Sequence, residues 1–251
     1  MLKNSSKTEQ LFSKSKPIDK LLEQDAFKLM VNEQKKGVDE VAKVLPELQK
    51  VVNEVFKILS NHDSSRIIYS GAGTSGRLGV QDGVELCPTF GWPMERLGFL
   101  IAGGKQALMK SVENSEDDIQ KAAEDTNSLK IKKSDVVIGI SASGNTPYTC
   151  EVLKKSKLKQ ALTICITNNQ NAEIIKYSDF CLILNTNQEV IAGSTRLKAG
   201  TAQKVCLNIL SSMVMIKLGK VKNGMMINMI ANNEKLRRRK LEISNVFKNC
   251  N

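Results

Sequence analysis

The sequence has few of the residues on which several classes of protein depend. Aromatic residues make up 4% of its 251 residues, which argues against a surface that stacks the bases of single-stranded nucleic acid. The one histidine, His62, lies in a polar stretch typical of a solvated loop, so acid–base chemistry is left to carboxylates, lysines or tyrosines. The six cysteines include no C-x-x-C pair, which disfavours both a zinc site and a disulfide framework.

Long apolar runs are also missing. No stretch approaches the roughly 20 apolar residues of a membrane span, and residues 1–7 lack the apolar core of a signal peptide. We therefore expect a cytoplasmic protein without a membrane partner. The net charge of +11 favours an anionic ligand. Part of this charge lies in residues 235–240, which we interpret as a solvated helix face in preference to a nucleic-acid contact.

Five short apolar runs recur along the middle of the chain, separated by helix-length segments and followed by Gly, Ser, Thr or Asn. They cover residues 67–70, 97–101, 136–140, 162–166 and 180–184. Such strands, alternating with helices, predict an α/β fold with a doubly wound parallel five-stranded sheet. Ligands of these sheets bind beyond the carboxyl ends of the strands, where the polar residues have collected.

Helical patterns flank the predicted sheet on both sides. Apolar positions recur at helical spacing from residue 17 to residue 60, which predicts two or three helices, and again over residues 198–218 and 232–246. Residues 1–16 are polar and are expected to be loosely held. We divide the chain into an N-terminal helical extension, a phosphate-binding domain and a C-terminal helical segment, over residues 1–60, 61–222 and 223–251.

The first predicted strand leads into a loop of glycines and hydroxyls. Residues 71–76 match G-x-G-x-x-G, but a dinucleotide site expects an acidic residue after the second strand, where residues 102–104 read Ala-Gly-Gly. The alternative is a phosphate loop, because glycines admit a ligand close to the backbone and a helix start attracts anions. We predict that Gly73, Thr74 and Ser75 bind phosphate.

A second hydroxyl-rich loop follows the third predicted strand. Ser141, Ser143, Gly144 and Thr146 again precede a helix. Ordinary turn and N-cap chemistry could explain either loop alone. Two strand ends of one sheet that together offer five hydroxyls favour a compact monophosphate, so we expect both loops to bind one anion.

These two loops resemble those of the sugar isomerase (SIS) domain, which binds phosphosugars. Further motifs make the chain similar to the N-acetylmuramic acid 6-phosphate etherases over about residues 8–241. They lie at residues 71–79, Glu85, 88–91, 101–104, 113–117, 141–144, 146–148, 189–204, Asn208, 219–221 and 233–236. The segment 189–204 is the longest and most specific of them.

The resemblance implies a reaction and a set of residues. The family cleaves the lactyl ether of its sugar phosphate without metal or cofactor, through loss of the C2 proton, departure of the C3 ether and addition of water. Glu85 matches the acid that protonates the leaving lactate, and Glu116 matches the other catalytic carboxylate. Burial and mutual repulsion can keep one carboxylate charged and one protonated. Within the segment 189–204, the resemblance assigns substrate contacts to Glu189, Ser194 and Lys198.

The resemblance also implies a homodimer that binds a small sugar phosphate, with the N-terminal helices in the interface. Two departures from the family are Asn145, where an arginine is common, and a shorter C-terminal segment. The main alternative is a non-catalytic phosphosugar sensor like the glucokinase regulatory proteins. A DNA-binding regulator is less favoured because no helix-turn-helix precedes residue 60, and an aldose–ketose isomerase is disfavoured by the segment 189–204.

Overall fold

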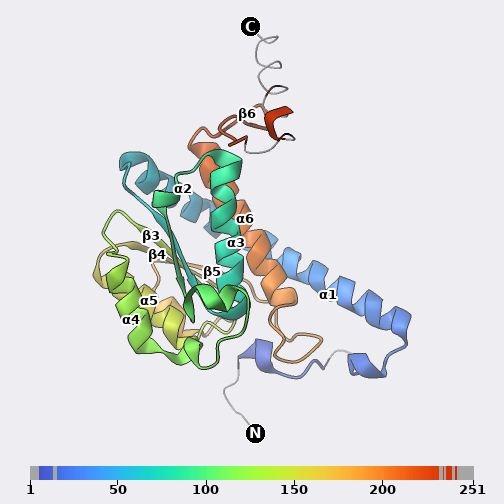
Figure 1. Ribbon diagram of the computed structural model, residues 1–251. Helices are drawn as coiled ribbons and strands as arrows, with labels where there is room; N and C mark the ends of the chain where they lie inside the picture. The colour runs from blue at the N-terminus through green and yellow to red at the C-terminus, as the bar shows by residue number, and fades with distance from the viewer. Residues whose placement is uncertain (1–5, 14–15, 232–233, 235, 239–240, 242–251) are drawn as a thin grey trace.

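The computed structural model describes residues 6–13, 16–231, 234, 236–238 and 241. Its centre is a five-stranded parallel sheet with the strand order β2-β1-β3-β4-β5 (Figure 1). The strands are β1 (Ile67–Gly71), β2 (Leu97–Ile101), β3 (Val136–Ser141), β4 (Leu162–Thr167) and β5 (Phe180–Ile183). All five predicted runs are strands, and the predicted fold class is confirmed.

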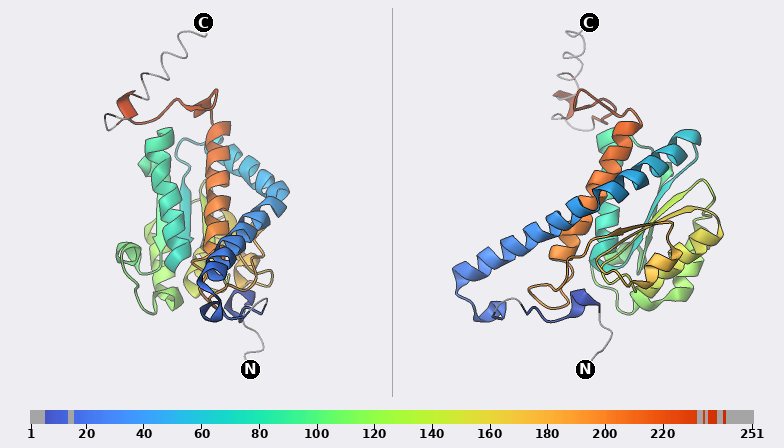
Figure 2. Two further views of the ribbon diagram at one scale, coloured as in Figure 1. Left: turned by 90° about the vertical axis from the view of Figure 1, so that its right-hand side faces the viewer. Right: turned by 180° about the vertical axis from the view of Figure 1, so that it is seen from behind.

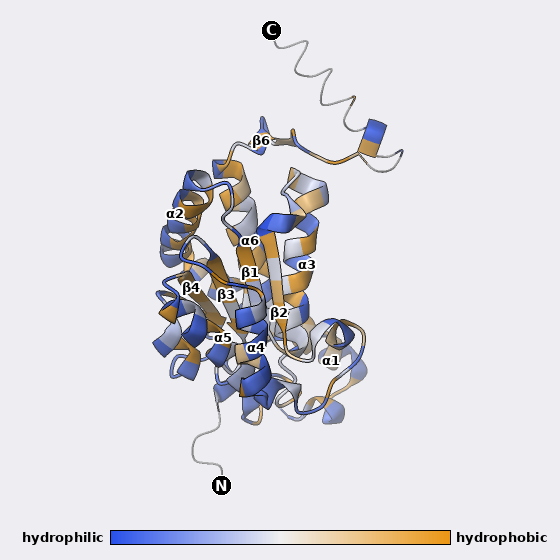
Figure 3. Ribbon diagram, turned by 60° about the vertical axis from the view of Figure 1, so that its left-hand side comes forward, coloured by the Kyte–Doolittle hydropathy of each residue, from blue (hydrophilic) through white to orange (hydrophobic). Residues whose placement is uncertain are grey.

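Helices cover both faces of the sheet. The helices are α1 (Glu23–Lys43), α2 (Leu45–Asn61), α3 (Gly73–Phe90), α4 (Ile119–Ser128), α5 (Pro147–Leu158) and α6 (Lys198–Lys217). Side chains of β3 alternate between two apolar cores, because successive strand residues point to opposite faces. Ile138 packs with α2, α3 and α6, whereas Val137 packs with α4 and α5. Figure 3 shows the resulting pattern, with the strands coloured as apolar inside more polar helices.

The N-terminal region consists of two long helices, in line with the predicted two or three. Pro46 lies in the first turn of α2, where its missing N–H costs no hydrogen bond. Helix α1 crosses the start of α6 at Gly37, where a Cβ atom would lie 2.8 Å from the Lys198 carbonyl oxygen. From this crossing, the N-terminal half of α1 extends away from the sheet (Figure 2). Because α2 shares a core with the sheet, packing is continuous across residue 60.

The expectation of a loosely held N-terminus is wrong for part of it. Lys7–Glu9 forms one 3₁₀ turn, and Thr8 within it is fully buried. Hydrogen bonds to Asn169, which follows β4, hold this turn against the sheet domain. The polar composition of residues 1–16 gives no sign of this contact, because hydrogen bonds anchor the turn and an apolar stripe does not.

The region after α6 was predicted only in part. Helix α6 matches its predicted span, but β6 (Val221–Lys222) and β7 (Met225–Met226) form a hairpin that was not predicted. Asn223 and Gly224 between them both have positive φ, as a two-residue hairpin turn of type I′ requires. The predicted helix over 232–246 and the basic run 235–240 lie largely outside the described residues. Among the described residues, no helix is long and apolar enough to cross a membrane.

Candidate active site

A cavity of about 390 Å³ lies at the carboxyl ends of β1 and β3. Because these strands are neighbours in the sheet, the two predicted loops lie side by side in its wall. The lining residues are Glu9, Ala72, Gly73, Thr74, Ser75, Glu116, Ser141, Ala142, Ser143, Thr146 and Thr195. The structure thus brings all five predicted hydroxyl side chains to one cavity, and their binding of an anion stays a prediction.

The first loop brings the start of α3 directly against β1. A Cβ atom on Gly76 would lie 2.8 Å from the Gly71 carbonyl oxygen, so only glycine permits this approach. The N–H groups of Gly73, Thr74 and Ser75 begin the helix and have no carbonyl in a preceding turn to bond. These amides and the positive end of the helix dipole are suited to bind an anion at the cavity wall.

The Ser75 side chain is part of a buried chain of polar groups. Its Oγ lies 2.9 Å from Oε1 of Gln203, whose Nε2 donates to Asn168 Oδ1 at 2.9 Å. Because Oε1 can only accept, the Ser75 hydroxyl donates to it. Ser75 can therefore offer its backbone N–H to a phosphate, while its hydroxyl proton is already engaged.

The second loop is held by a tight glycine turn. Gly144 has φ of +71°, and a Cβ atom there would lie 2.3 Å from the Ala172 Cβ, so a side chain would clash. The Gly144 N–H donates to Ser141 Oγ at 3.0 Å, and Ser141 Oγ lies 2.9 Å from Thr146 Oγ1. Ser143 Oγ accepts from the backbone N–H of Asn145 and lies 3.5 Å from Ser141 Oγ. At that distance the contact with Ser141 is weak, so a ligand can compete for the Ser143 hydroxyl proton.

Asn145 does not contribute charge to the cavity. Its Oδ1 accepts a hydrogen bond from the Glu173 N–H at 2.9 Å, so its side chain ties the second loop to the segment after β4. The arginine common in the family would add a cation near this loop. The side chains that the second loop brings to the cavity are neutral.

The two predicted catalytic carboxylates lie in different places. Glu116 lines the cavity from the 3₁₀ turn Ser115–Asp117, which follows Asn114 in the left-handed conformation. Glu85 is exposed on α3 and is not among the lining residues. It lies ten residues beyond Ser75, or about 15 Å along a helix that rises ~1.5 Å per residue. One chain therefore brings Glu116, but not Glu85, to its own cavity.

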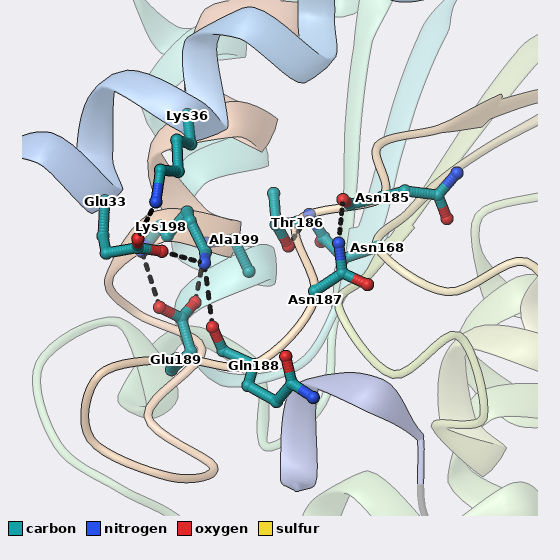
Figure 4. Close-up of polar contacts among 10 residues, drawn as sticks. All are labelled: Glu33, Lys36, Asn168, Asn185, Thr186, Asn187, Gln188, Glu189, Lys198 and Ala199. Carbon is teal, nitrogen blue, oxygen red and sulfur yellow. Dashed lines mark hydrogen bonds and ion pairs between the residues drawn. The ribbon is translucent and has the colours of Figure 1, made fainter. Parts of the chain in front are cut away.

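Glu189 and Lys198 belong to a buried network beside the cavity (Figure 4). The Glu189 carboxylate accepts from the backbone N–H groups of Lys198 and Ala199 and so caps the start of α6. Burial raises the pKa of Glu189, and the two N–H groups oppose that shift. Both side chains are at most 2% exposed, and neither lines the cavity.

The Lys198 ammonium group binds two acceptors in the same network. Its Nζ donates to Glu33 Oε2 on α1 at 2.6 Å and to the Gln188 carbonyl oxygen at 2.8 Å. Burial alone would raise the pKa of Glu33, but hydrogen bonds from Lys198 and Lys36 bring it below its usual value. Direct contact of Glu189 or Lys198 with a substrate stays a prediction, and the geometry favours an indirect role.

Two polar lining residues, Thr195 and Glu9, were not predicted as site residues. Thr195 follows the predicted Ser194, which is half-buried and is not among the lining residues. A signal for Thr195 was present, since it lies in the specific segment 189–204. Glu9 lay at the start of the region of similarity, but we treated its segment as a loose tail. Its place depends on the docking of the turn Lys7–Glu9, which no local pattern predicts.

Comparisons with known proteins agree with this architecture. A profile of the glucokinase regulatory protein N-terminal SIS domain matches residues 48–157. The chain also resembles a solved putative phosphosugar isomerase involved in capsule formation from Bacteroides fragilis. That likeness has a TM-score of 0.60 and 20% identity, and covers 80% of this chain and 94% of that one. It supports the fold alone.

Two relatives of known family are much closer in sequence. The N-acetylmuramic acid 6-phosphate etherase of Lactobacillus johnsonii is 44% identical over 229 residues, which cover 91% of this chain and 76% of that protein. The enzyme of the same name from Deinococcus radiodurans is 40% identical over 230 residues, which cover 92% and 75%. Both alignments extend over nearly the whole chain. The chain belongs to the N-acetylmuramic acid 6-phosphate etherase family.

Proposed function

We propose that this chain is a carbon–oxygen lyase that cleaves the lactyl ether of N-acetylmuramic acid 6-phosphate. The products are N-acetylglucosamine 6-phosphate and D-lactate, as in the recycling of peptidoglycan amino sugars. The family membership supports this activity. The observation that carries it is the presence of Glu116 in the same cavity as the two hydroxyl-rich loops.

The cavity suits the 6-phosphate because it offers many hydrogen-bond donors. None of the described residues that line it is a lysine or an arginine. Neutral donors and the N-terminal ends of α3 and α5 must therefore balance the phosphate charge. We assign this task to the backbone N–H groups of Gly73, Thr74 and Ser75 and to the hydroxyls of Ser143 and Thr146.

The chemistry needs one group that removes a proton and one that supplies a proton. With the sugar ring open, the C1 aldehyde acidifies the C2 proton, and we assign its removal to the Glu116 carboxylate. The electron pair forms a C2–C3 double bond as the C3–O bond breaks, and an acid protonates the departing lactate oxygen. Water then adds at C3 while C2 regains a proton. Each proton transfer contributes about 10²–10⁴ in rate.

We place Glu85 from a second copy of the chain at this cavity as the acid. Glu85 faces solvent and lies far along α3 from its own chain's loops. Exposed apolar side chains on α1, including Phe27 at 66% and Val31 at 53%, support a homodimer with the N-terminal helices in its interface. A cytoplasmic location completes the proposal.

The test is release of D-lactate by the purified chain from the 6-phosphorylated sugar ether. The unphosphorylated ether is the control, since it lacks the group that the two loops bind, and it should react far more slowly. Absence of D-lactate from both substrates would overturn the proposal. The match to the glucokinase regulatory protein domain supports a second candidate, a phosphosugar sensor, which tight binding without lactate release would favour.

A further inference from the structure

The 3₁₀ turn Lys7–Glu9 forms part of the cavity wall and is firmly held there. The Lys7 N–H donates to Asn169 Oδ1 at 2.8 Å, and Asn169 Nδ2 lies 3.2 Å from the Oγ1 of the buried Thr8. The same Nδ2 donates to the Ala142 carbonyl oxygen at 2.8 Å. One asparagine thus joins the turn to the second phosphate loop, which fixes where the next residue, Glu9, can lie.

The Glu9 carboxylate lies between this turn and the loop that precedes α6. A Cβ atom on Gly193 would be 3.0 Å from Glu9 Oε2, and Gly193 has φ of +73°. The absence of a side chain at Gly193 therefore leaves space for the carboxylate. Two residues further on, Thr195 lines the same cavity as Glu9. The carboxylate thus lies at the cavity next to a loop from the other half of the sequence.

The Glu9 carboxylate is unsuited to bind a phosphate group and is suited to bind the hydroxyl groups of a sugar phosphate. A carboxylate has only acceptor atoms and repels a phosphate, whereas it accepts hydrogen bonds from hydroxyl groups readily. Among the described residues, none forms an ion pair with Glu9. Its acceptor oxygens therefore remain available at a cavity whose other wall already supplies the donors for a phosphate.

We propose that Glu9 is a specificity-determining residue that accepts hydrogen bonds from the hydroxyl groups of the bound sugar 6-phosphate. The proposal rests on the substrate class of the proposed function and adds the recognition of its sugar part. The loops bind the phosphate, and Glu9 selects ligands that carry hydroxyl donors next to it. Inorganic phosphate lacks the sugar and gains nothing from Glu9.

The test compares the binding of two ligands to Glu9→Gln by isothermal titration calorimetry. For N-acetylglucosamine 6-phosphate, we expect the dissociation constant to rise about tenfold, which corresponds to ~1.4 kcal/mol. For inorganic phosphate, the constant should stay the same or fall, because a repulsive charge is removed. Glu113→Gln is the matched control, since Glu113 is exposed near Glu116 but does not line the cavity.

Two results would overturn the proposal. The first is an unchanged affinity of Glu9→Gln for the sugar phosphate, and the second is an equal loss of affinity for both ligands. Neither result depends on lactate release, so the test separates Glu9 from the proposed reaction. If the unaltered chain released no D-lactate but Glu9→Gln selectively lost sugar phosphate, the etherase proposal would fail and the role of Glu9 would stand.

Discussion

The cavity and the buried network beside it contain different kinds of polar residue. The cavity is lined by hydroxyls, backbone amides and two exposed carboxylates, Glu9 and Glu116. The network holds Glu33, Glu189 and Lys198, all at most 2% exposed, within hydrogen-bonding distance of one another or of backbone. Charged side chains that pair in a buried network leave the neighbouring cavity to neutral donors.

This difference suggests that the cavity residues bind the ligand, whereas the network residues position the cavity wall. A lysine in the cavity would bind phosphate directly, but Lys198 instead joins α1 to the loop before α6 through Glu33 and Gln188. Glu189 fixes the first turn of α6 from the same loop. Thr195, which lines the cavity, lies between these two anchors in the sequence. We infer that the network holds the 190–197 segment in place and that the cavity performs the chemistry.

The largest effect is expected at the cavity, from Glu116→Gln. Loss of the base should lower kcat by about 10²–10⁴-fold, because no other described carboxylate except Glu9 lines the cavity. NMR of substrate in deuterated buffer should show loss of C2 proton exchange together with loss of lactate release. Asp117→Asn, a change at the exposed neighbour, is the control and should keep both. Retained exchange in Glu116→Gln would remove Glu116 from the role of base.

Glu85→Gln should fail at a different step. If Glu85 is the acid, C2 exchange should persist while lactate release falls by a factor of about 10²–10⁴. Mixing Glu85→Gln with Glu116→Gln should restore activity, because a mixed dimer would contain one site with both carboxylates. Loss of exchange in Glu85→Gln would instead make Glu85 the base. No recovery in mixtures shown to exchange subunits would rule out a shared site.

In the network, Lys198→Met should act on stability. It removes the buried cation of Glu33 and leaves only Lys36, whose side chain is half exposed, to pair with that carboxylate. The loss of one partner of a buried ion pair typically costs up to about 3–5 kcal/mol of unfolding free energy. Urea unfolding should show this as a lower midpoint. Ser143→Ala, which removes a hydroxyl from the cavity, should keep the midpoint and weaken phosphate binding instead. If both variants changed the same property, the division between binding and positioning would be wrong.

Much of this arrangement could be predicted from local patterns. The apolar run of β3 is buried on both faces, so its sequence identified it without help from other segments. The hydroxyl-rich loops could also be predicted from the sequence. Each follows an apolar run, and the carboxyl ends of parallel strands share one edge of the sheet. That β1 and β3 are neighbours is a property of the sheet order, which apolar runs do not encode.

The remaining features depend on contacts between distant segments. Lys198 pairs with Glu33 and does not line the cavity, because α1 crosses at Gly37 and brings Glu33 to it. Helical spacing predicts no such crossing. Glu9 reaches the cavity because Asn169 anchors the turn before it. The hairpin at Asn223 and Gly224 is different, because an Asn-Gly turn is a local signal, and the sequence itself therefore supports the hairpin.

The smallest effect should come from Glu33→Gln, which tests the network through its pH dependence. Hydrogen bonds from Lys198 and Lys36 hold the pKa of Glu33 below its usual 4.5, against the effect of burial. A carboxylate with a lowered pKa contributes stability above its unfolded pKa, and that contribution is lost as pH falls through the folded value.

Glu33→Gln should therefore cost about 1–3 kcal/mol at pH 7, the range for hydrogen bonds to charged groups. The difference from the unaltered chain should begin to shrink as pH falls below 4.5, where the unfolded state becomes protonated, and should be lost only as pH falls through the lowered folded value. Protonation of Glu189 favours the folded state because its pKa is raised, but Glu189 is present in both chains, so this contribution largely cancels from the difference. Urea unfolding at several pH values, with the exposed α1 change Asp39→Asn as control, measures the difference. A pH-independent difference would show that Glu33 acts by its shape and not by its charge.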